Sequence, residues 1–195
     1  FVLMKSLEKI LPLEGELPVD YADRAGLSYS VFVSQNHKKI KGQFLTPSAI
    51  ARFMGQLAES NMTNISILDP GCGTAILSCS ILEHLVQTNS SLKSVSLDAY
   101  EIDPDILPIT VNVLEYLNLW LKRRNVTFSY NLINEDFILK NASVFTNSIS
   151  LFDLINHSEY DFIISNPPYF KLNKEDKRAK VADSIASGQP NIYAL

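Results

Sequence analysis

The sequence predicts an α/β fold, in which helices flank a parallel β-sheet. Four short apolar runs with strand character recur along the chain, and the segments between them are long enough for crossover helices. Several of these runs end in glycine, acidic or amide residues, the groups with which open parallel sheets bind ligands at the carboxyl ends of their strands. The 195 residues are 46% hydrophobic, so the chain can bury one good core. We therefore expect a single α/β core.

The composition narrows the class of protein. The two cysteines, Cys72 and Cys79, are too few and too close for a secreted disulfide framework, and we interpret them as small buried residues. No apolar run approaches the roughly 18 residues of a membrane span. We expect a cytoplasmic protein without membrane association. The three histidines lack ligand-like spacing, so we expect no metal site.

The N-terminal part of the chain is the least regular. Residues 2–11 have the spacing of an amphipathic helix, and a stretch interrupted by proline and glycine follows them. We treat residues 1–41 as an N-terminal helical segment and residues 42–195 as the main domain. The main domain opens with a helix at Thr46 and Pro47, since threonine is a good N-cap and proline suits the first helical position. The predicted apolar face of this helix consists of Ile50, Phe53, Met54 and Leu57.

Strands and helices then alternate. One helix is expected from Thr74 onward, and the next is marked more clearly, because Asp103 can cap it and Pro104 suits its first turn. Apolar residues at helical spacing in it are Ile106, Ile109, Val113 and Leu117. The four strands are predicted at residues 65–69, 95–101, 126–134 and 161–165. Four aromatic residues among apolar neighbours, Tyr29, Phe32, Tyr116 and Trp120, are predicted to be in the core.

The first strand ends in the loop "LDPGCG", which contains Asp69, Pro70, Gly71 and Gly73. The two glycines let the backbone approach a ligand closely, and the amides of the helix that follows face that ligand. A dinucleotide fingerprint would require a third glycine where Ile76 stands, and no Walker phosphate loop is present. Asp69 repels pyrophosphate but suits an ammonium group, although a turn or cap residue is its plainer explanation. The loop therefore favours S-adenosylmethionine over NAD.

The next two strand ends offer matching groups. Glu101 can accept hydrogen bonds from both hydroxyls of a ribose, and Ile102 beside it can pack on an adenine face. After the third strand, Asp136 can accept from an exocyclic amine, and Phe137 can cover the other face of the ring. Each pair alone is more typical of an ordinary loop. Three consecutive strand ends that supply what an adenosyl ligand needs indicate one binding site.

With these residues the chain resembles the gamma-class S-adenosylmethionine-dependent adenine DNA methyltransferases of restriction-modification systems. The segments "GQFLTP", "LDPGCG", "EID", "EDF" and "NPPY" follow one another in the gamma order, and "SGQPNIYAL" ends the chain. The resemblance implies a Rossmann-like class I methyltransferase fold. It also implies that Thr46 and Pro47 lie against the methionine part of the cofactor, and that Asp69, Pro70, Gly71 and Gly73 hold its amino-acid moiety. Glu101 would hold the ribose, and Ile102, Asp136 and Phe137 the adenine.

The segment "NPPY" after the fourth strand carries the predicted chemistry. The exocyclic nitrogen of adenine is a poor nucleophile, because its lone pair is delocalised into the ring. The side-chain oxygen of Asn166 and the carbonyl of Pro167 can each accept one N–H and aim the lone pair at the methyl group. Pro168 stiffens the loop, Tyr169 offers a stacking face, and the target base must be flipped out of the duplex. Two prolines also simply end a buried strand, which is the structural alternative.

Other functions remain compatible with the same residues. Protein glutamine methyltransferases that act on release factors, and some RNA base methyltransferases, carry a similar "NPPY" and activate a similar planar nitrogen. The combination of "GQFLTP" and "GQPNIYAL" favours the DNA family. A cofactor-binding or specificity module without activity is a third alternative, against which Asn166 and Tyr169 argue.

The predicted partner is double-stranded DNA. The formal net charge of −4 requires a local basic surface. Residues 171–180 contain five basic and two acidic residues, and Lys38, Lys39 and Lys41 form a second basic cluster. Only 26 residues follow Tyr169, so we expect a core truncated after its fourth strand. A domain or subunit outside this chain would then supply specificity, and the resemblance also allows for a restriction subunit.

Overall fold

The computed structural model describes residues 10–32, 45–142, 159–167 and 175–182. Within these ranges the chain forms a four-stranded sheet with the order β3-β2-β1-β4, in which all neighbouring pairs are parallel. The predicted parallel sheet is therefore confirmed. The last strand pairs over two residues only, fewer than the sequence predicts. The strands are β1 (Asn64–Asp69), β2 (Ser94–Tyr100), β3 (Thr127–Ile133) and β4 (Phe162–Ile163).

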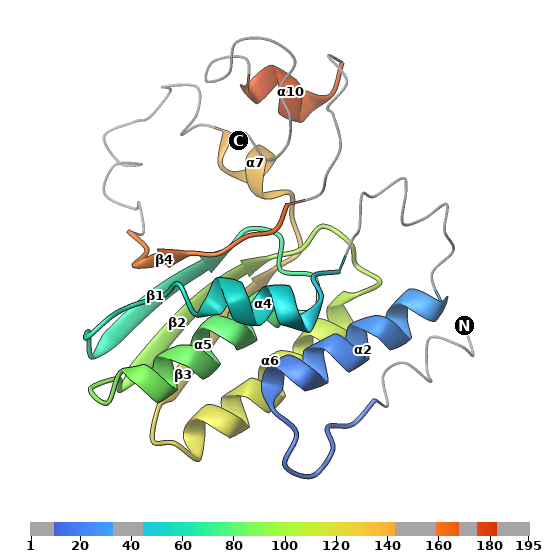
Figure 1. Cartoon of the computed structure of the whole chain (residues 1–195). Helices are drawn as coiled ribbons and strands as arrows, with labels where there is room; N and C mark the ends of the chain where they lie inside the picture. Colours follow the sequence, from blue (N-terminus) through green and yellow to red (C-terminus); the bar gives the residue numbers. More distant parts are fainter. Residues whose placement is uncertain (1–9, 33–44, 143–158, 168–174, 183–195) are drawn as a thin grey trace.

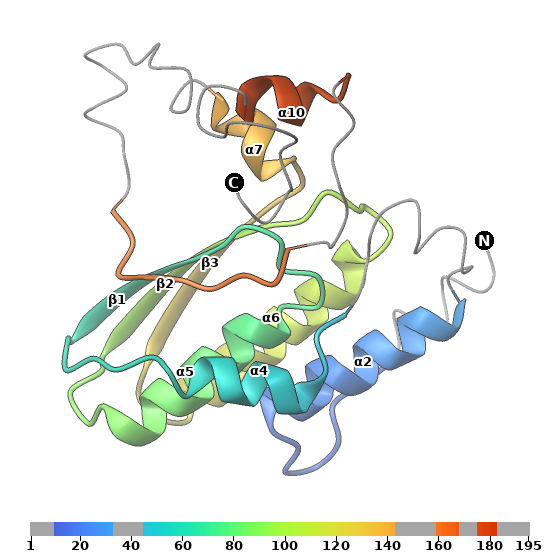
Figure 2. The same ribbon diagram turned by 45° about the horizontal axis from the view of Figure 1, so that its top comes forward.

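Four helices cover one side of the sheet, and two short helices lie together on the other side (Figures 1 and 2). The covering helices are α2 (Pro18–Phe32), α4 (Ser48–Gly55), α5 (Ile76–Thr88) and α6 (Leu107–Lys122). The short helices are α7 (Phe137–Lys140) and α10 (Lys177–Ala182). None of the helices described is long and apolar enough to cross a membrane.

The core lies between the sheet and the covering helices. Ile65 and Val95 are paired neighbours on β1 and β2, and both side chains are buried. Strand residues with the opposite parity are polar over much of the sheet, as Ser66, Ser96 and Ser129 show. Because side chains alternate along a strand, one face of the sheet is apolar and the other is largely polar. The buried aromatic residues Tyr29 and Trp120 confirm two of the four core predictions.

Two helices begin later than the sequence predicts. Helix α6 begins at Leu107, so Pro104 lies before it, and Asp103 does not cap it. Instead the buried Asp103 accepts a hydrogen bond from the Tyr29 hydroxyl at 3.0 Å and stabilises the turn before the helix. Helix α5 begins at Ile76 because Ala75 has a left-handed backbone, with φ 61°. Thr74 thus belongs to the loop.

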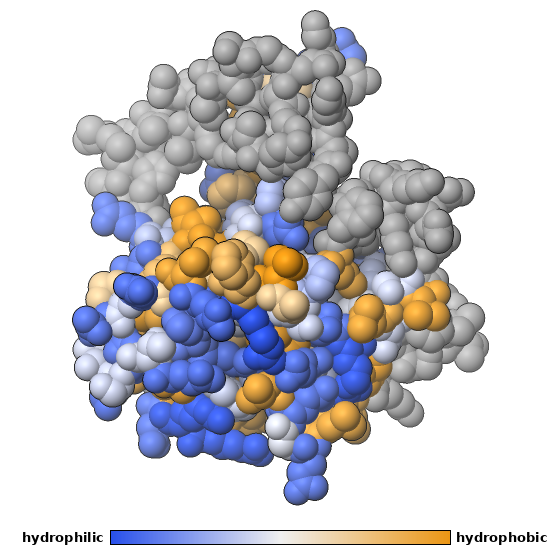
Figure 3. Space-filling view, in the orientation of Figure 1, coloured by the Kyte–Doolittle hydropathy of each residue, from blue (hydrophilic) through white to orange (hydrophobic). Residues whose placement is uncertain are grey.

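Helix α4 is present, but its predicted cap is wrong, and of its predicted apolar face only Met54 packs against the core. Pro47 occupies the N-cap position without a side-chain hydrogen bond, so Thr46 does not cap the helix. The helix packs through its small residues Ala51 and Gly55, which are buried. The other predicted apolar residues are exposed, and apolar side chains gather over this helix on the molecular surface (Figure 3). The exposed ones are Ile50, Phe53 and Leu57.

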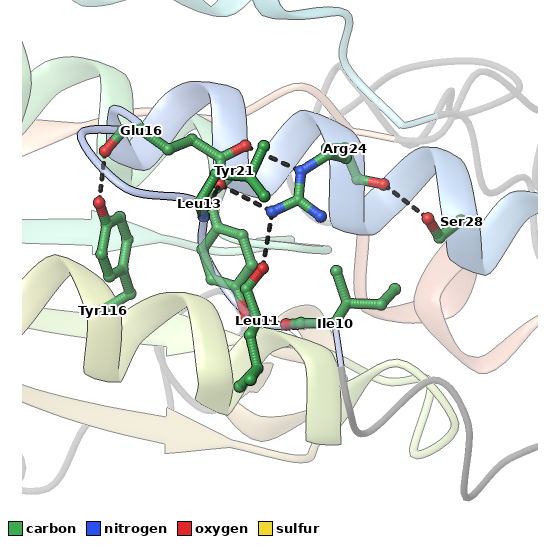
Figure 4. A network of polar contacts seen from close by, with 8 residues as sticks. All are labelled: Ile10, Leu11, Leu13, Glu16, Tyr21, Arg24, Ser28 and Tyr116. Carbon is green, nitrogen blue, oxygen red and sulfur yellow. Dashed lines mark hydrogen bonds and ion pairs between the residues drawn. The ribbon is translucent and has the colours of Figure 1, made fainter.

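Helix α2 is missing from the sequence prediction, which places a helix at residues 2–11 instead. Residues 1–9 are not described, and Ile10 and Leu11 are not helical. Hydrogen bonds join Ile10 and Leu11 to helix α2 (Figure 4). The Tyr21 hydroxyl donates to Ile10 O at 2.6 Å, and the Arg24 guanidinium donates to Leu11 O and Glu16 Oε1, each at 2.8 Å. Since α2 packs on α5 and α6, the core includes residues before position 42, and the predicted domain division stays a prediction.

Candidate active site

A tight loop follows β1 and is held by contacts with α6 and with the end of β2. Gly73 has φ 53°, which favours glycine. Its carbonyl accepts a hydrogen bond from the Thr110 hydroxyl of α6 at 2.6 Å. The Cys72 amide donates to Tyr100 O at 2.8 Å, which ties the loop to the end of β2. Beside Gly71, a Cβ atom would meet no other atom within 4 Å, so the space there is open to a ligand.

Asp69 ends β1 with a fully buried carboxylate. Its Oδ2 atom accepts from the Ser78 hydroxyl at 2.7 Å, whereas Oδ1 has no hydrogen-bond partner among the described residues. Burial raises the pKa of Asp69 to about 7. The Ser78 hydroxyl and the nearby Gly71 amide only partly offset this effect, and the negative charge of Glu101 increases it. A buried carboxylate oxygen without a partner is suited to a cationic donor such as an ammonium group.

Glu101 is held between the loop and the next turn. Its Oε2 atom accepts from the Gly73 amide at 2.9 Å, and Oε1 accepts from the Asp103 amide at 2.7 Å. The Asn134 side chain donates to the Glu101 carbonyl at 2.7 Å. Burial raises the pKa of Glu101, against the lowering effect of the two amides. Each carboxylate oxygen can accept a further hydrogen bond, so Glu101 has the capacity to bind the ribose hydroxyls as well.

The residues expected around an adenine ring lie beyond β2 and β3. Ile102 is exposed, and the Phe137 ring meets the Tyr100 ring edge-on, with centroids 5.1 Å apart. Asp136 caps α7 by accepting from the Leu139 amide at 2.9 Å, and its Oδ2 atom lies 3.8 Å from Nη1 of Arg178 on α10. The Asp136 carboxylate thus has protein partners that an adenine amine would have to share or displace.

The end of β4 lies beside the end of β1. The Ile164 amide donates to Leu68 O at 3.0 Å, so Asn166 follows directly next to the Asp69 loop. The Asn166 side chain donates through Nδ2 to Thr46 Oγ1 at 2.9 Å. Of the remaining predicted site residues, Pro70 and Pro167 are half-buried, Pro47 is exposed, and Pro168 and Tyr169 lie outside the described residues.

Three residues that support the site are absent from the sequence prediction. Ser78 holds Asp69, Thr110 holds the Gly73 carbonyl, and Asn134 holds the Glu101 carbonyl. Thr110 is a fully buried hydroxyl within the apolar stripe of α6. A polar residue in such a stripe needs a partner, which is a signal that the sequence offers. Ser78 lies in a helix segment that is buried nearly throughout and gives the same signal.

Two of the three described basic residues in the predicted basic segment are paired with acids. Arg178 contacts Asp176 at 2.6 Å, and Lys180 lies 3.5 Å from Glu175. The other cluster, at Lys38, Lys39 and Lys41, lies outside the described residues. In the part of the chain that the structure describes, no group of three His, Cys, Asp or Glu side chains is arranged to hold a metal ion.

Comparisons with known proteins identify the family. The N-6 DNA Methylase family matches residues 22–190. Type II methyltransferase M.PstI from Providencia stuartii is 27% identical over 154 residues, which are 78% of this chain and 29% of that protein. Type II methyltransferase M.AccI from Acinetobacter calcoaceticus is 29% identical over 173 residues, 86% of this chain and 26% of that protein. The chain thus spans less than a third of the length of these relatives.

A solved structure confirms the class of fold. A protein from Listeria monocytogenes, described as a class I S-adenosylmethionine-dependent methyltransferase, superposes with a TM-score of 0.56 at 19% identity. The match covers 94% of this chain and 49% of that protein. The predicted Rossmann-like class I methyltransferase fold is confirmed, and S-adenosylmethionine is the cofactor that the fold and the family support. With most of its length matched, the chain belongs to the N-6 DNA Methylase family.

Proposed function

We propose that this chain is the cofactor-binding and catalytic part of an enzyme that transfers a methyl group from S-adenosylmethionine to N6 of adenine in DNA. One observation carries the proposal. The amide of Asn166 follows β4 at the point where β4 pairs with β1, so it lies next to the Asp69 loop. A group that can hold a target amine is thereby placed beside a loop suited to a zwitterionic cofactor.

The cofactor roles follow from the chemistry of the loop and strand ends. The unpaired Oδ1 of Asp69 suits the ammonium group of the methionine moiety, and open space beside Gly71 admits it. Glu101 accepts from the ribose hydroxyls, and Ile102 and Phe137 contact the adenine. Asp136 accepts a hydrogen bond from the adenine amine. Arg178 then either moves away from the Asp136 carboxylate or shares it with the amine. When bound, S-adenosylmethionine supplies an electrophilic methyl group on a sulfonium.

The chain activates the target amine by positioning it. Asn166 Oδ1 accepts one N–H of the adenine amine, and the carbonyl of Pro167 accepts the other. Two acceptors in fixed positions localise the nitrogen lone pair and direct it toward the methyl group, so no strong base is required before transfer. Pro168 would hold the backbone of this loop, and Tyr169 would stack on the flipped base.

The substrate is proposed to be double-stranded DNA. The relatives are named Type II methyltransferases, and they are more than three times longer than the part that this chain matches. We therefore propose that a domain or subunit outside these residues supplies sequence specificity, and that a restriction or specificity subunit is a partner. Contacts with DNA phosphates would come from the predicted basic clusters, residues 171–180 and Lys38, Lys39 and Lys41, through the side chains that are not paired with acids.

Substitution of Asn166 tests this function. In the full-length protein, Asn166→Ala should leave S-adenosylmethionine affinity nearly unchanged and lower single-turnover methyl transfer to duplex DNA by about 10²- to 10³-fold. Asn166→Asp should retain more activity, because a carboxylate still accepts the hydrogen bond. Mass spectrometry identifies the product base. Labelled glutamine in a protein substrate, with adenine unlabelled, would instead favour the release-factor type of methyltransferase.

A further inference from the structure

Thr46 contacts the proposed catalytic amide directly. Its Oγ1 atom accepts a hydrogen bond from Asn166 Nδ2 at 2.9 Å, and Thr46 is only 8% exposed. The two residues are 120 positions apart in the sequence. A hydroxyl buried at this place therefore fixes one end of the amide and leaves it little competition from water.

The orientation of a side-chain amide decides what it can bind. Its oxygen only accepts hydrogen bonds and its nitrogen only donates them, although both ends have nearly the same shape. The target amine presents N–H donors, so it can pair with the amide oxygen and is repelled by the amide nitrogen. An amide that turns by 180° would keep its packing and lose its function.

We propose that Thr46 is a positioning residue that holds the Asn166 amide in place, with the amide nitrogen on the Thr46 hydroxyl and Oδ1 directed toward the target amine. The inference rests on the proposed function of Asn166. It differs from the role that the family resemblance implies for Thr46, which is contact with the methionine part of the cofactor. By binding the nitrogen end, Thr46 turns the oxygen end away from itself.

The surroundings of Thr46 make it a firm anchor. Leu45, the preceding residue, packs between α2 and the glycine loop, since its side chain lies near the positions where Cβ atoms on Gly26 and Gly73 would be. On the other side of Thr46, α4 is bonded to α5, where the Ser80 hydroxyl donates to Ala51 O at 2.5 Å. Thr46 is thus held by the elements that hold the cofactor loop. Its hydrogen bond to Asn166 therefore fixes the position of the amide relative to that loop.

A pair of Thr46 variants in the full-length protein tests the inference. Thr46→Val keeps the shape but removes the acceptor, whereas Thr46→Ser keeps the hydroxyl. We expect Thr46→Val to lower methyl transfer at saturating S-adenosylmethionine by about 10-fold, the effect of losing one hydrogen bond of ordinary strength, with the cofactor dissociation constant nearly unchanged. Thr46→Ser should retain most of the rate. A weaker cofactor affinity with a parental rate at saturation would instead make Thr46 a cofactor ligand and overturn the inference.

A double-mutant cycle separates positioning from an independent effect. If Thr46 acts through Asn166, Thr46→Val should cost nothing further in an Asn166→Ala background. A second 10-fold loss there would show that Thr46 acts on its own and would overturn the inference. Equal melting temperatures of the Thr46 variants serve as the control for folding.

A measurement without catalysis distinguishes failure of the inference from failure of the proposed function. The side-chain NH₂ signals of Asn166 in ¹⁵N-edited NMR spectra should shift, and their exchange with water should accelerate, in Thr46→Val but not in Thr46→Ser. Unchanged signals in Thr46→Val would overturn the contact. If the contact is seen but the parent protein methylates no DNA, the proposed function is wrong and Thr46 positions nothing for catalysis, so the inference falls with it.

Discussion

The proposed pairing of the Asp69 carboxylate with the ammonium group of the cofactor predicts that cofactor binding depends on pH. Its pKa is raised to about 7, so the ionised form that attracts an ammonium group is lost as the pH falls through that value. The ammonium of an amino acid loses its proton above about pH 8. We therefore expect S-adenosylmethionine affinity to be greatest between these two values. Calorimetry across pH 5.5–9 measures it, and Asp69→Asn should remove the acid limb; a parental acid limb in that variant would exclude Asp69 as its source.

The same residue predicts how stability changes with pH in the absence of cofactor. Asp69 has a pKa near 3.8 in an unfolded chain and about 7 in the fold, so the folded state binds the proton more tightly. Its contribution to stability is therefore fully present below the lower value and is lost as the pH rises through the higher one. Urea titrations of the parent and of Asp69→Asn should show a smaller decline between pH 5 and 8 in the variant. Identical declines would place the titrating group elsewhere.

The positions of single residues follow from the sequence where strand ends determine them, whereas their roles stay predictions. Asp69, Gly73 and Glu101 meet at one edge because parallel strands bring their carboxyl ends together, and the sequence shows where each strand ends. Partners that come from distant segments leave no such pattern. Neither the bond between Thr46 and Asn166 nor the ion pair between Asp136 and Arg178 follows from local spacing.

At the level of elements, α4 shows why a strong apolar pattern can mislead. Its large residues suggest the buried face, but the helix approaches α5 through Gly55, where a side chain would collide with the facing backbone. Close helix packing selects small residues, and that requirement is invisible until the partner is known. Helix α2 was missed for a different reason, because proline and glycine interrupt the sequence around it.

Gly55→Ala tests this close approach. An added Cβ would lie 2.7 Å from the backbone carbonyl of Ser80, a contact that no side-chain rotation relieves. We expect a loss of about 1–3 kcal/mol in unfolding free energy and a lower methyl-transfer rate, because α4 carries Thr46 at its start. Ile50→Ala, on the exposed side of the same helix, is the matched control and should change both little. Equal stability of the parent and Gly55→Ala would show that α4 is not packed this closely.

For the whole molecule, the fold class follows from the alternation of strand and helix patterns, whereas the extent of the core does not. In the described residues, the helices α2, α4, α5 and α6 cover one face of the sheet, and much of the opposite face carries polar strand residues. Ser66, Ser96 and Ser129 are ordinary strand residues in the sequence, and only the pairing shows that they share a face. Burial depends on which elements meet, and this is not encoded locally.

Ligand binding should stabilise the whole fold selectively. A cofactor that binds only the native state at 100 times its dissociation constant adds about 2.7 kcal/mol to stability. S-adenosylmethionine or its demethylated product should therefore raise the melting temperature, whereas NADH should not. Glu101→Ala should reduce the increase, because its carboxylate connects the loop to β2. A shift with NADH and none with S-adenosylmethionine would contradict the proposed cofactor.

The strand order β3-β2-β1-β4 has a consequence for how the protein forms during translation. The segments that make the cofactor loop and Glu101 leave the ribosome early, and β1 can pair with β2 at once. The other edge of β1 stays unpaired until β4 has been made. The first residue of β4 is 93 positions after the last residue of β1. Until then a central, apolar strand has one row of backbone groups exposed, which is the kind of edge that recruits other chains. We therefore expect nascent chains to be most prone to aggregate in this interval. The segment that ends the interval also carries Asn166, the proposed catalytic residue.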